Sequence, residues 1–175
     1  MLSLALGSAS AHAQFLRQHT DMPEGWWLSA GAALYVPPTS VANMRLVDVG
    51  AEVGVSWFAP SSPWVLGADA QVLASALTHA DGTDDALSRY SFGLRVGLFT
   101  VGLEAGVFGR RGFSDGSHSS GVFGLLYASC GFGSVGLQIE TDLASSGLAE
   151  QLGTNAGFAF TFKVPWQIHA PPREH

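Results

Sequence analysis

The chain has 175 residues, a net charge of −6, 47% hydrophobic residues and only 13% charged residues. Its length suits one domain, and its acidic balance, with arginines scattered along the chain, argues against nucleic-acid binding. No apolar run approaches about 18 residues, which excludes a membrane-spanning helix. The single cysteine, Cys130, excludes an internal disulfide.

The first residues have the features of a secretory signal. An apolar stretch from Leu2 to Leu6 is followed by Ala11-His12-Ala13, which has the small-x-small pattern of a cleavage site. Gln14 is then the expected first residue of the mature protein. We therefore expect residues 1–13 to be the remnant of a signal peptide and the folded domain to occupy residues 14–164.

Apolar residues alternate with glycine, polar or charged residues along most of the chain, a period of two that predicts β-strands. One face of each segment is apolar, as where Tyr90, Phe92 and Leu94 occupy even positions. Most segments reach the roughly 9 to 11 tilted residues that cross a bilayer. An even number of antiparallel strands can close into an up-and-down barrel. The predicted strands are residues 26–36, 43–58, 64–75, 88–99, 101–111, 121–131, 134–144 and 154–164.

The polar face of these segments distinguishes a soluble barrel from a membrane barrel. A soluble barrel turns its apolar face inward and needs many charged residues outside, whereas here the polar face is largely Gly, Ser and Ala. Charged residues make up 13% of the chain, against about 25% in ordinary soluble proteins. We therefore predict an all-β protein, an eight-stranded antiparallel up-and-down transmembrane β-barrel, with its apolar face toward lipid and its charges in the lumen.

Side chains of the polar face are expected to fill the lumen, because a barrel of eight strands leaves little other space. Inward glycines are expected to make room for the longer side chains, and Cys130 to point inward as a small filler. These glycines are at positions 31, 50, 54, 67, 93, 97, 102, 106, 124 and 136. The expected charge network is Asp48, Glu52, Asp69, Arg95, Glu104, Glu140 and Asp142, with Gln71 and Gln138 beside it.

A two-residue turn at Phe99-Thr100 predicts the register of two neighbouring strands. It places Arg95 opposite Glu104 inside the lumen, where an unpaired charge would be costly, so we expect an ion pair. It also places Arg89 opposite Arg110. Like charges that face each other in this way need an acid or an anion between them.

The connections between the predicted strands alternate in length. Those after the third, fifth and seventh strands run to about ten residues rich in Gly, Ser and Asp, and are expected to face the outside. Asp115 in one of them, or a lipopolysaccharide phosphate, is expected to lie between the two facing arginines. No metal site is expected, because the acidic run from Asp81 to Asp85 lacks the full calcium-loop pattern. The outer-loop interaction candidates are His79, Asp81, Asp84, Asp85, Arg89, Arg110, Arg111 and His118.

Aromatic residues fall near both ends of the predicted strands. Two girdles about one membrane apart are the pattern of membrane barrels, because amphipathic rings favour the interface. The inner girdle is predicted to be Trp26, Trp57, Trp64 and Phe162, and the outer girdle Tyr35, Tyr90, Phe113 and Phe123.

The last predicted strand carries the spacing polar-x-Gly-x-x-apolar-x-apolar, with Asn155, Gly157, Phe160 and Phe162 at the defining positions. This spacing resembles the closing-strand signal of bacterial outer-membrane barrels. With its strand count, the chain resembles the small eight-stranded barrels of Gram-negative bacteria, the class of the OmpX-like proteins and the OmpA membrane domain. Residues 165–175, which contain three prolines, are expected to form a periplasmic tail.

The resemblance implies a location in the bacterial outer membrane and insertion by the barrel-assembly machinery through residues Asn155 to Phe162. It also implies contact with outer-membrane lipid and lipopolysaccharide, a monomeric state and no cofactor.

Three functions are compatible with such a barrel. We favour a non-enzymatic barrel with a plugged lumen and surface loops for structural or interaction roles. An outer-membrane lipid-modifying enzyme would need a Ser, a His and a carboxylate near the outer leaflet, and no recognisable hydrolase motif surrounds His79 or His118. A narrow conduit for small hydrophobic molecules is the third hypothesis, since inward glycines widen the lumen. The loop residues of suitable type for an enzyme are Ser75, His79, Asp81, Asp84, Asp85, Ser114, Asp115, His118, Ser119 and Ser120.

Overall fold

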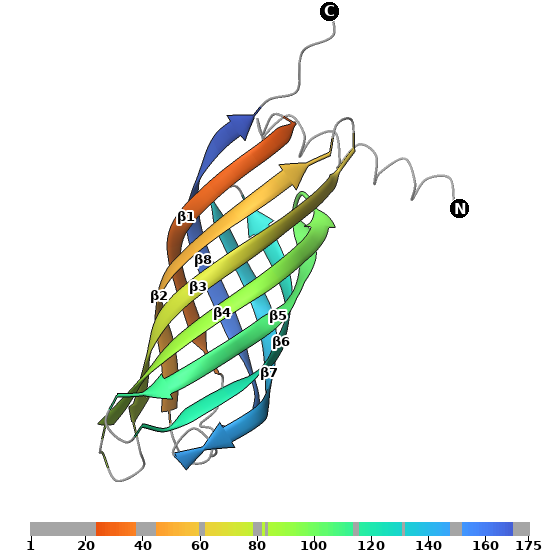
Figure 1. Ribbon diagram of the computed structural model, residues 1–175. Coiled ribbons are helices and arrows are strands. Elements are labelled where there is room, and N and C mark those ends of the chain that lie inside the picture. Colours follow the sequence, from red (N-terminus) through yellow and green to blue (C-terminus); the bar gives the residue numbers. More distant parts are fainter. Residues whose placement is uncertain are drawn as a thin grey trace, which may run out of the picture.

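Eight antiparallel strands form one sheet that closes on itself in chain order, as Figure 1 shows. The structure is a computed structural model. It describes residues 24–37, 45–59, 62–78, 82, 84–113, 116–130, 132–147 and 152–169. Within these residues no helix is long and apolar enough to cross a membrane. The predicted all-β fold of eight up-and-down strands in a closed ring is confirmed. The strands are β1 (Gly25–Val36), β2 (Arg45–Phe58), β3 (Trp64–Thr78), β4 (Asp84–Leu98), β5 (Val101–Gly112), β6 (His118–Cys130), β7 (Gly133–Ser146) and β8 (Thr154–His169).

The two ends of the barrel differ in their connections. At one end, which we call the turn end, β1 begins, β8 ends, and the β4–β5 and β6–β7 turns are tight (Figure 1, upper end). At the opposite end, which we call the loop end, the strands extend further than predicted: β3 reaches Thr78 and β4 already starts at Asp84. The connection between them is therefore shorter than expected. Leu77 and Leu87 explain the extension, because both side chains are fully buried inside this end of the barrel.

The outer wall of the barrel is apolar. Leu94 is 62% exposed and Val53 is 52% exposed, and they belong to a belt of exposed aliphatic and aromatic residues found on all eight strands. The interior, in contrast, contains nearly every charged side chain of the strand centres, including fully buried Arg110 and Glu140. This polarity is the reverse of that in a soluble barrel.

The predicted register of β4 and β5 is confirmed. Arg95 lies opposite Glu104, and Arg89 lies opposite Arg110. Arg89 and Arg95 occupy odd positions of β4, whose odd side chains point into the barrel, while the even ones, such as Leu94, point outward. The tight turn at Phe99-Thr100 therefore sets which charged side chains meet inside.

The expectation of a tail from residue 165 onward is wrong for its first part, because β8 continues to His169 and pairs with β1. Pro165 lies within this strand, opposite Ser29. The pairing of β8 with β7 ends at Phe162, and the Lys163 N–H donates to Phe132 on that side. The N–H that Pro165 lacks would point the same way, beyond the end of β7, so the proline costs no ladder hydrogen bond.

The sequence pattern was misleading for the orientation of several residues. Cys130 is exposed and Gly124 faces outward, whereas Phe123 and Tyr127 are buried inside. Strand β6 has large apolar residues on both faces, so its alternation does not show which face is interior. Tyr35 is also buried rather than part of an outer girdle.

Candidate functional site

The charged side chains inside the barrel form two clusters at different heights. The loop-end cluster consists of Asp48, Arg89, Arg110, Glu140 and Asp142. The turn-end cluster consists of Glu52, Asp69, Arg95, Glu104 and Lys163. Every member of the predicted lumen charge network belongs to one of these clusters, and the structure adds the arginines of the loop end and Lys163.

Glu140 on β7 lies between the two facing arginines of the loop-end cluster. Arg89 Nη2 donates to Glu140 Oε1 at 2.6 Å, and Arg110 Nη2 pairs with Glu140 Oε2. Asp48 lies 3.8 Å from Arg89, and Asp142 lies 3.6 Å from Arg110. The acid that the structure shows between the arginines is therefore Glu140. Asp115, the predicted candidate, lies outside the described residues. Arg89 and Arg110 are interior residues and not outer-loop contacts.

Aromatic rings and amides complete the loop-end cluster. The Arg110 guanidinium lies 4.6 Å from the centre of the Phe108 ring, and Arg89 lies 5.5 Å from the same ring. Beside them the Tyr35 hydroxyl donates to Asn155 Oδ1 at 2.5 Å. Arg89, Arg110 and Glu140 are each at most 1% exposed. These side chains therefore lie inside the barrel and are shielded from solvent.

In the turn-end cluster, two cations are shared by two carboxylates. Arg95 Nε donates to Asp69 Oδ2 at 2.7 Å, and its Nη2 donates to Glu52 Oε1 at 3.2 Å. Lys163 Nζ donates to Asp69 Oδ1 at 3.1 Å and also pairs with Glu52. Gln71 donates to the second oxygen of Glu52 at 3.1 Å. The sequence analysis did not predict Lys163 as a lumen residue. Its position could have been inferred, because it is an even number of residues from Gly157 on the last strand and therefore points to the same, inner face.

The expected ion pair between Arg95 and Glu104 is wrong, although their register is right. Arg95 instead extends over Gly67, the residue opposite it on β3, toward Asp69. The missing side chain at Gly67 opens that route. Among the described residues, no ion pair or hydrogen bond engages the Glu104 carboxylate, which is only 6% exposed.

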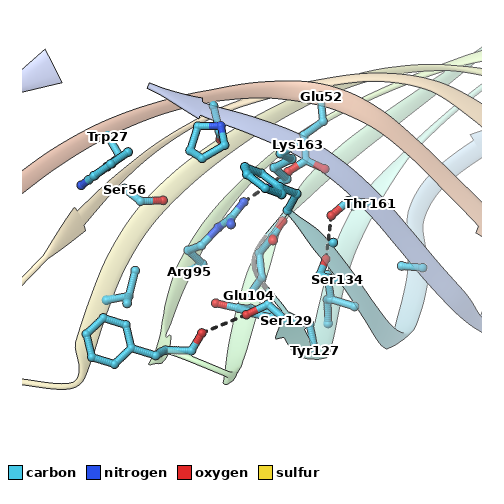
Figure 2. Close-up of a pocket in the computed structure, with 18 of the residues that line it drawn as sticks. Trp27, Glu52, Ser56, Arg95, Glu104, Tyr127, Ser129, Ser134, Thr161 and Lys163 are labelled. Carbon is cyan, nitrogen blue, oxygen red and sulfur yellow. Dashed lines mark hydrogen bonds and ion pairs between the residues drawn. The ribbon is translucent and has the colours of Figure 1, made fainter. Parts of the chain in front are cut away.

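A cavity of about 130 Å³ lies beside the turn-end cluster. Figure 2 shows Arg95, Glu104 and Lys163 around it, with Trp27 and Ser56 on the side away from Thr161. Toward the turn end its wall becomes aromatic. These rings are Trp27, Phe58, Phe99 and Phe132.

The surface candidates are dispersed. Arg111, Asp84 and His118 are exposed on strand ends, and Asp85 is half-buried. His118 Nδ1 lies 2.8 Å from the Oγ of Ser146, a residue that was not predicted. His79 and Asp81 lie outside the described residues. In the described part of the chain, no three His, Cys, Asp or Glu side chains gather as a metal site would require.

Comparison with known proteins adds no assignment. The sequence matches no protein-family model, and it matches no curated protein.

Proposed function

We propose that this chain is a monomeric, non-enzymatic barrel of the Gram-negative outer membrane, related in design to the OmpX-like class. The observation that carries the proposal is the reversed polarity of the closed barrel. Side chains such as Leu94 and Val53 form an apolar outer wall, while Arg89, Arg110 and Glu140 are buried inside. In water such a wall would be a large exposed apolar surface, whereas in lipid it is favourable.

Exposed aromatic side chains near both ends support a membrane position. Trp26, Trp64 and Phe162 are exposed toward the turn end, and Tyr90 and Phe113 toward the loop end. Amphipathic rings favour the two interfaces of a bilayer, and two such belts bracket the aliphatic wall. In this proposal the loop end faces outward, where the exposed Arg111 and His118 are available to lipopolysaccharide phosphates. Residues Asn155 to Phe162 are the proposed signal for the barrel-assembly machinery.

Fractionation and gel mobility test the proposal directly. We expect the protein in the outer-membrane fraction, and we expect the unboiled protein to migrate differently from the boiled protein on a denaturing gel. A soluble periplasmic pool with no heat-dependent shift would contradict the membrane proposal.

The loop-end cluster argues against a conduit. Its paired charges and aromatic rings, such as Arg89, Glu140 and Phe123, are at most 5% exposed, which supports a closed barrel at this height over a conduit. An eight-stranded barrel is typically filled in this way. We expect no stepwise conductance when the purified protein is inserted in a planar bilayer. Regular single-channel steps that disappear with a bulky residue at Gly93 would favour the conduit instead.

One contact favours the lipid-modifying enzyme as a second candidate. His118 and Ser146 are hydrogen-bonded at 2.8 Å on the exposed loop end, and a base beside a hydroxyl is the first requirement of a serine nucleophile. Incubating the refolded protein with phospholipid and lipopolysaccharide, and measuring released fatty acid, tests this candidate. Fatty-acid release that Ser146→Ala abolishes would contradict the non-enzymatic proposal and support the enzyme.

A further inference from the structure

The turn-end cluster has more negative than positive charges. Its carboxylates are those of Glu52, Asp69 and Glu104, and its cations are Arg95 and Lys163. Arg95 Nε donates to Asp69 Oδ2 at 2.7 Å, and Lys163 Nζ donates to Asp69 Oδ1 at 3.1 Å. Both cations also pair with Glu52. One carboxylate of the three is therefore left over.

Glu104 is that carboxylate, and it borders the cavity. Only 6% of Glu104 is exposed, and no described side chain forms a hydrogen bond or ion pair with its carboxylate. A buried charge without a partner is costly, whereas a buried carboxylate with a cationic partner gains a strong, charge-assisted hydrogen bond. The arrangement suits a cation that enters from outside.

The rest of the cavity wall suits an aromatic body. Phe58 and Phe99 are stacked with ring centres 5.8 Å apart, and Trp27 meets Phe58 edge-on at 6.3 Å. These rings line the same cavity as Glu104, toward the turn end of the barrel. Aromatic rings pack against one another and also attract cations.

The size of the cavity limits the ligand. Its volume is about 130 Å³, and it is partly open rather than enclosed. An enclosed engineered cavity of about 150 Å³ accommodates benzene, so a single aromatic ring is the largest body that fits here. We propose that the turn-end cavity binds a small aromatic amine or amidine, with its cationic head on the Glu104 carboxylate and its ring against Trp27, Phe58 and Phe99. This inference concerns the barrel interior and goes beyond the proposed function, because it requires only the closed barrel and not its location.

Binding is tested with the full chain refolded in detergent micelles, using benzylamine as the probe in isothermal titration calorimetry. We expect saturable binding, together with a change in tryptophan fluorescence because Trp27 lines the cavity. Benzyl alcohol has nearly the same shape without the charge and is expected to bind about tenfold more weakly. Benzoate is expected to show no binding, because Arg95 and Lys163 are already engaged.

Two variants separate the two halves of the cavity. Glu104→Gln is expected to weaken benzylamine binding about tenfold and leave benzyl alcohol binding unchanged, which also shows that the variant is folded. Phe99→Ala is expected to weaken the binding of both ligands by roughly fivefold, because it removes one of the aromatic rings that line the cavity. Phe113→Ala, at the exposed loop end, is the matched control and should change neither.

Several results would overturn the proposal. Equal affinity for benzylamine and benzyl alcohol would mean that Glu104 is neutral and selects no cation. Tighter binding of benzoate would assign the cavity to anions. Benzylamine binding that does not saturate, or that Glu104→Gln leaves unchanged in a variant with normal heat-dependent gel mobility, would place the amine elsewhere. None of these measurements depends on whether the protein fractionates with a membrane.

Discussion

At the scale of single residues, Glu140 has the most consequential position in the barrel. It is fully buried and pairs with both Arg89 and Arg110, which face each other across β4 and β5. We expect Glu140→Gln to lower the free energy of unfolding by about 3 to 5 kcal/mol, because it leaves two buried arginines without their shared carboxylate. Urea unfolding of the protein in lipid vesicles, followed by tryptophan fluorescence, measures the change.

Glu104→Gln is the matched comparison for that variant. Glu104 is similarly buried, but among the described residues none forms an ion pair or hydrogen bond with its carboxylate. Its neutralisation should therefore leave the free energy of unfolding unchanged or raise it. A loss as large as that of Glu140→Gln would show that Glu104 has a structural partner after all.

Gly157 provides a test of packing in the closing-strand motif. A Cβ atom at this position would lie 2.7 Å from the Tyr35 ring, so a larger residue must displace the ring and its bond to Asn155. We expect Gly157→Val to cost roughly 1 to 3 kcal/mol of unfolding free energy. The control is Gly124→Ala, because nothing lies within 4 Å of a Cβ added there. Thermal denaturation followed by gel mobility compares the two, and equal losses would contradict the packing argument.

At the scale of secondary-structure elements, the last part of β8 is a testable addition to the barrel. Residues Val164 to Gln167 pair with β1, between Ala30 and Trp27. A chain that stops after Lys163 should lower the midpoint of thermal unfolding, since it exposes the edge of β1. A chain that stops after His169 removes only residues beyond the strand and should behave like the full chain. Equal midpoints for the two truncations would mean that this extension does not stabilise the barrel.

Most strands could be predicted from the sequence because they alternate with a period of two and are separated by turns; β6, with large apolar residues on both faces, is the exception. The tight Phe99-Thr100 turn even predicted the register that brings Arg95 opposite Glu104. The ends of strands were less predictable: Pro165 looked like a strand breaker, and its tolerance depends on where β7 ends. That information comes from the neighbouring strand and not from the local sequence.

The candidate site was predictable in its composition and less so in its pairing. The alternation of apolar and polar residues correctly predicted that the carboxylates point into the barrel. The partner of each charge, however, depends on how far its side chain extends across neighbouring strands. Arg95 bonds to Asp69 on β3 and Lys163 bonds to it from β8, a separation of 94 residues between lysine and aspartate. Glu140 likewise reaches Arg89 from 51 residues away. No local pattern encodes such contacts.

At the scale of the whole molecule, the apolar wall makes a depth-dependent prediction. Val53 is near the middle of β2 and 52% exposed, so Val53→Arg should cost about 2 to 4 kcal/mol if the wall meets lipid. Thr78→Arg is the control: Thr78 is exposed at the loop end of β3, opposite Asp84 on one side and Arg45 on the other. One favourable and one unfavourable charged neighbour should leave its cost near zero. Urea unfolding in vesicles measures both variants. Equal costs for the two substitutions would indicate that the wall does not lie in a bilayer.

The chain order of the barrel has a consequence for how it folds. Among the described strands, each pairs with its neighbour in sequence, and the single exception is the seam between β1 and β8. Hairpins can therefore add one after another with little loss of chain entropy, whereas the seam joins residues such as Tyr35 and Asn155, which are 120 positions apart. Lys163 meets Asp69 and Glu52 only once that seam has formed. We therefore expect ring closure to be the late, slow event of assembly, with the lysine bonded to its two acids only in the finished ring.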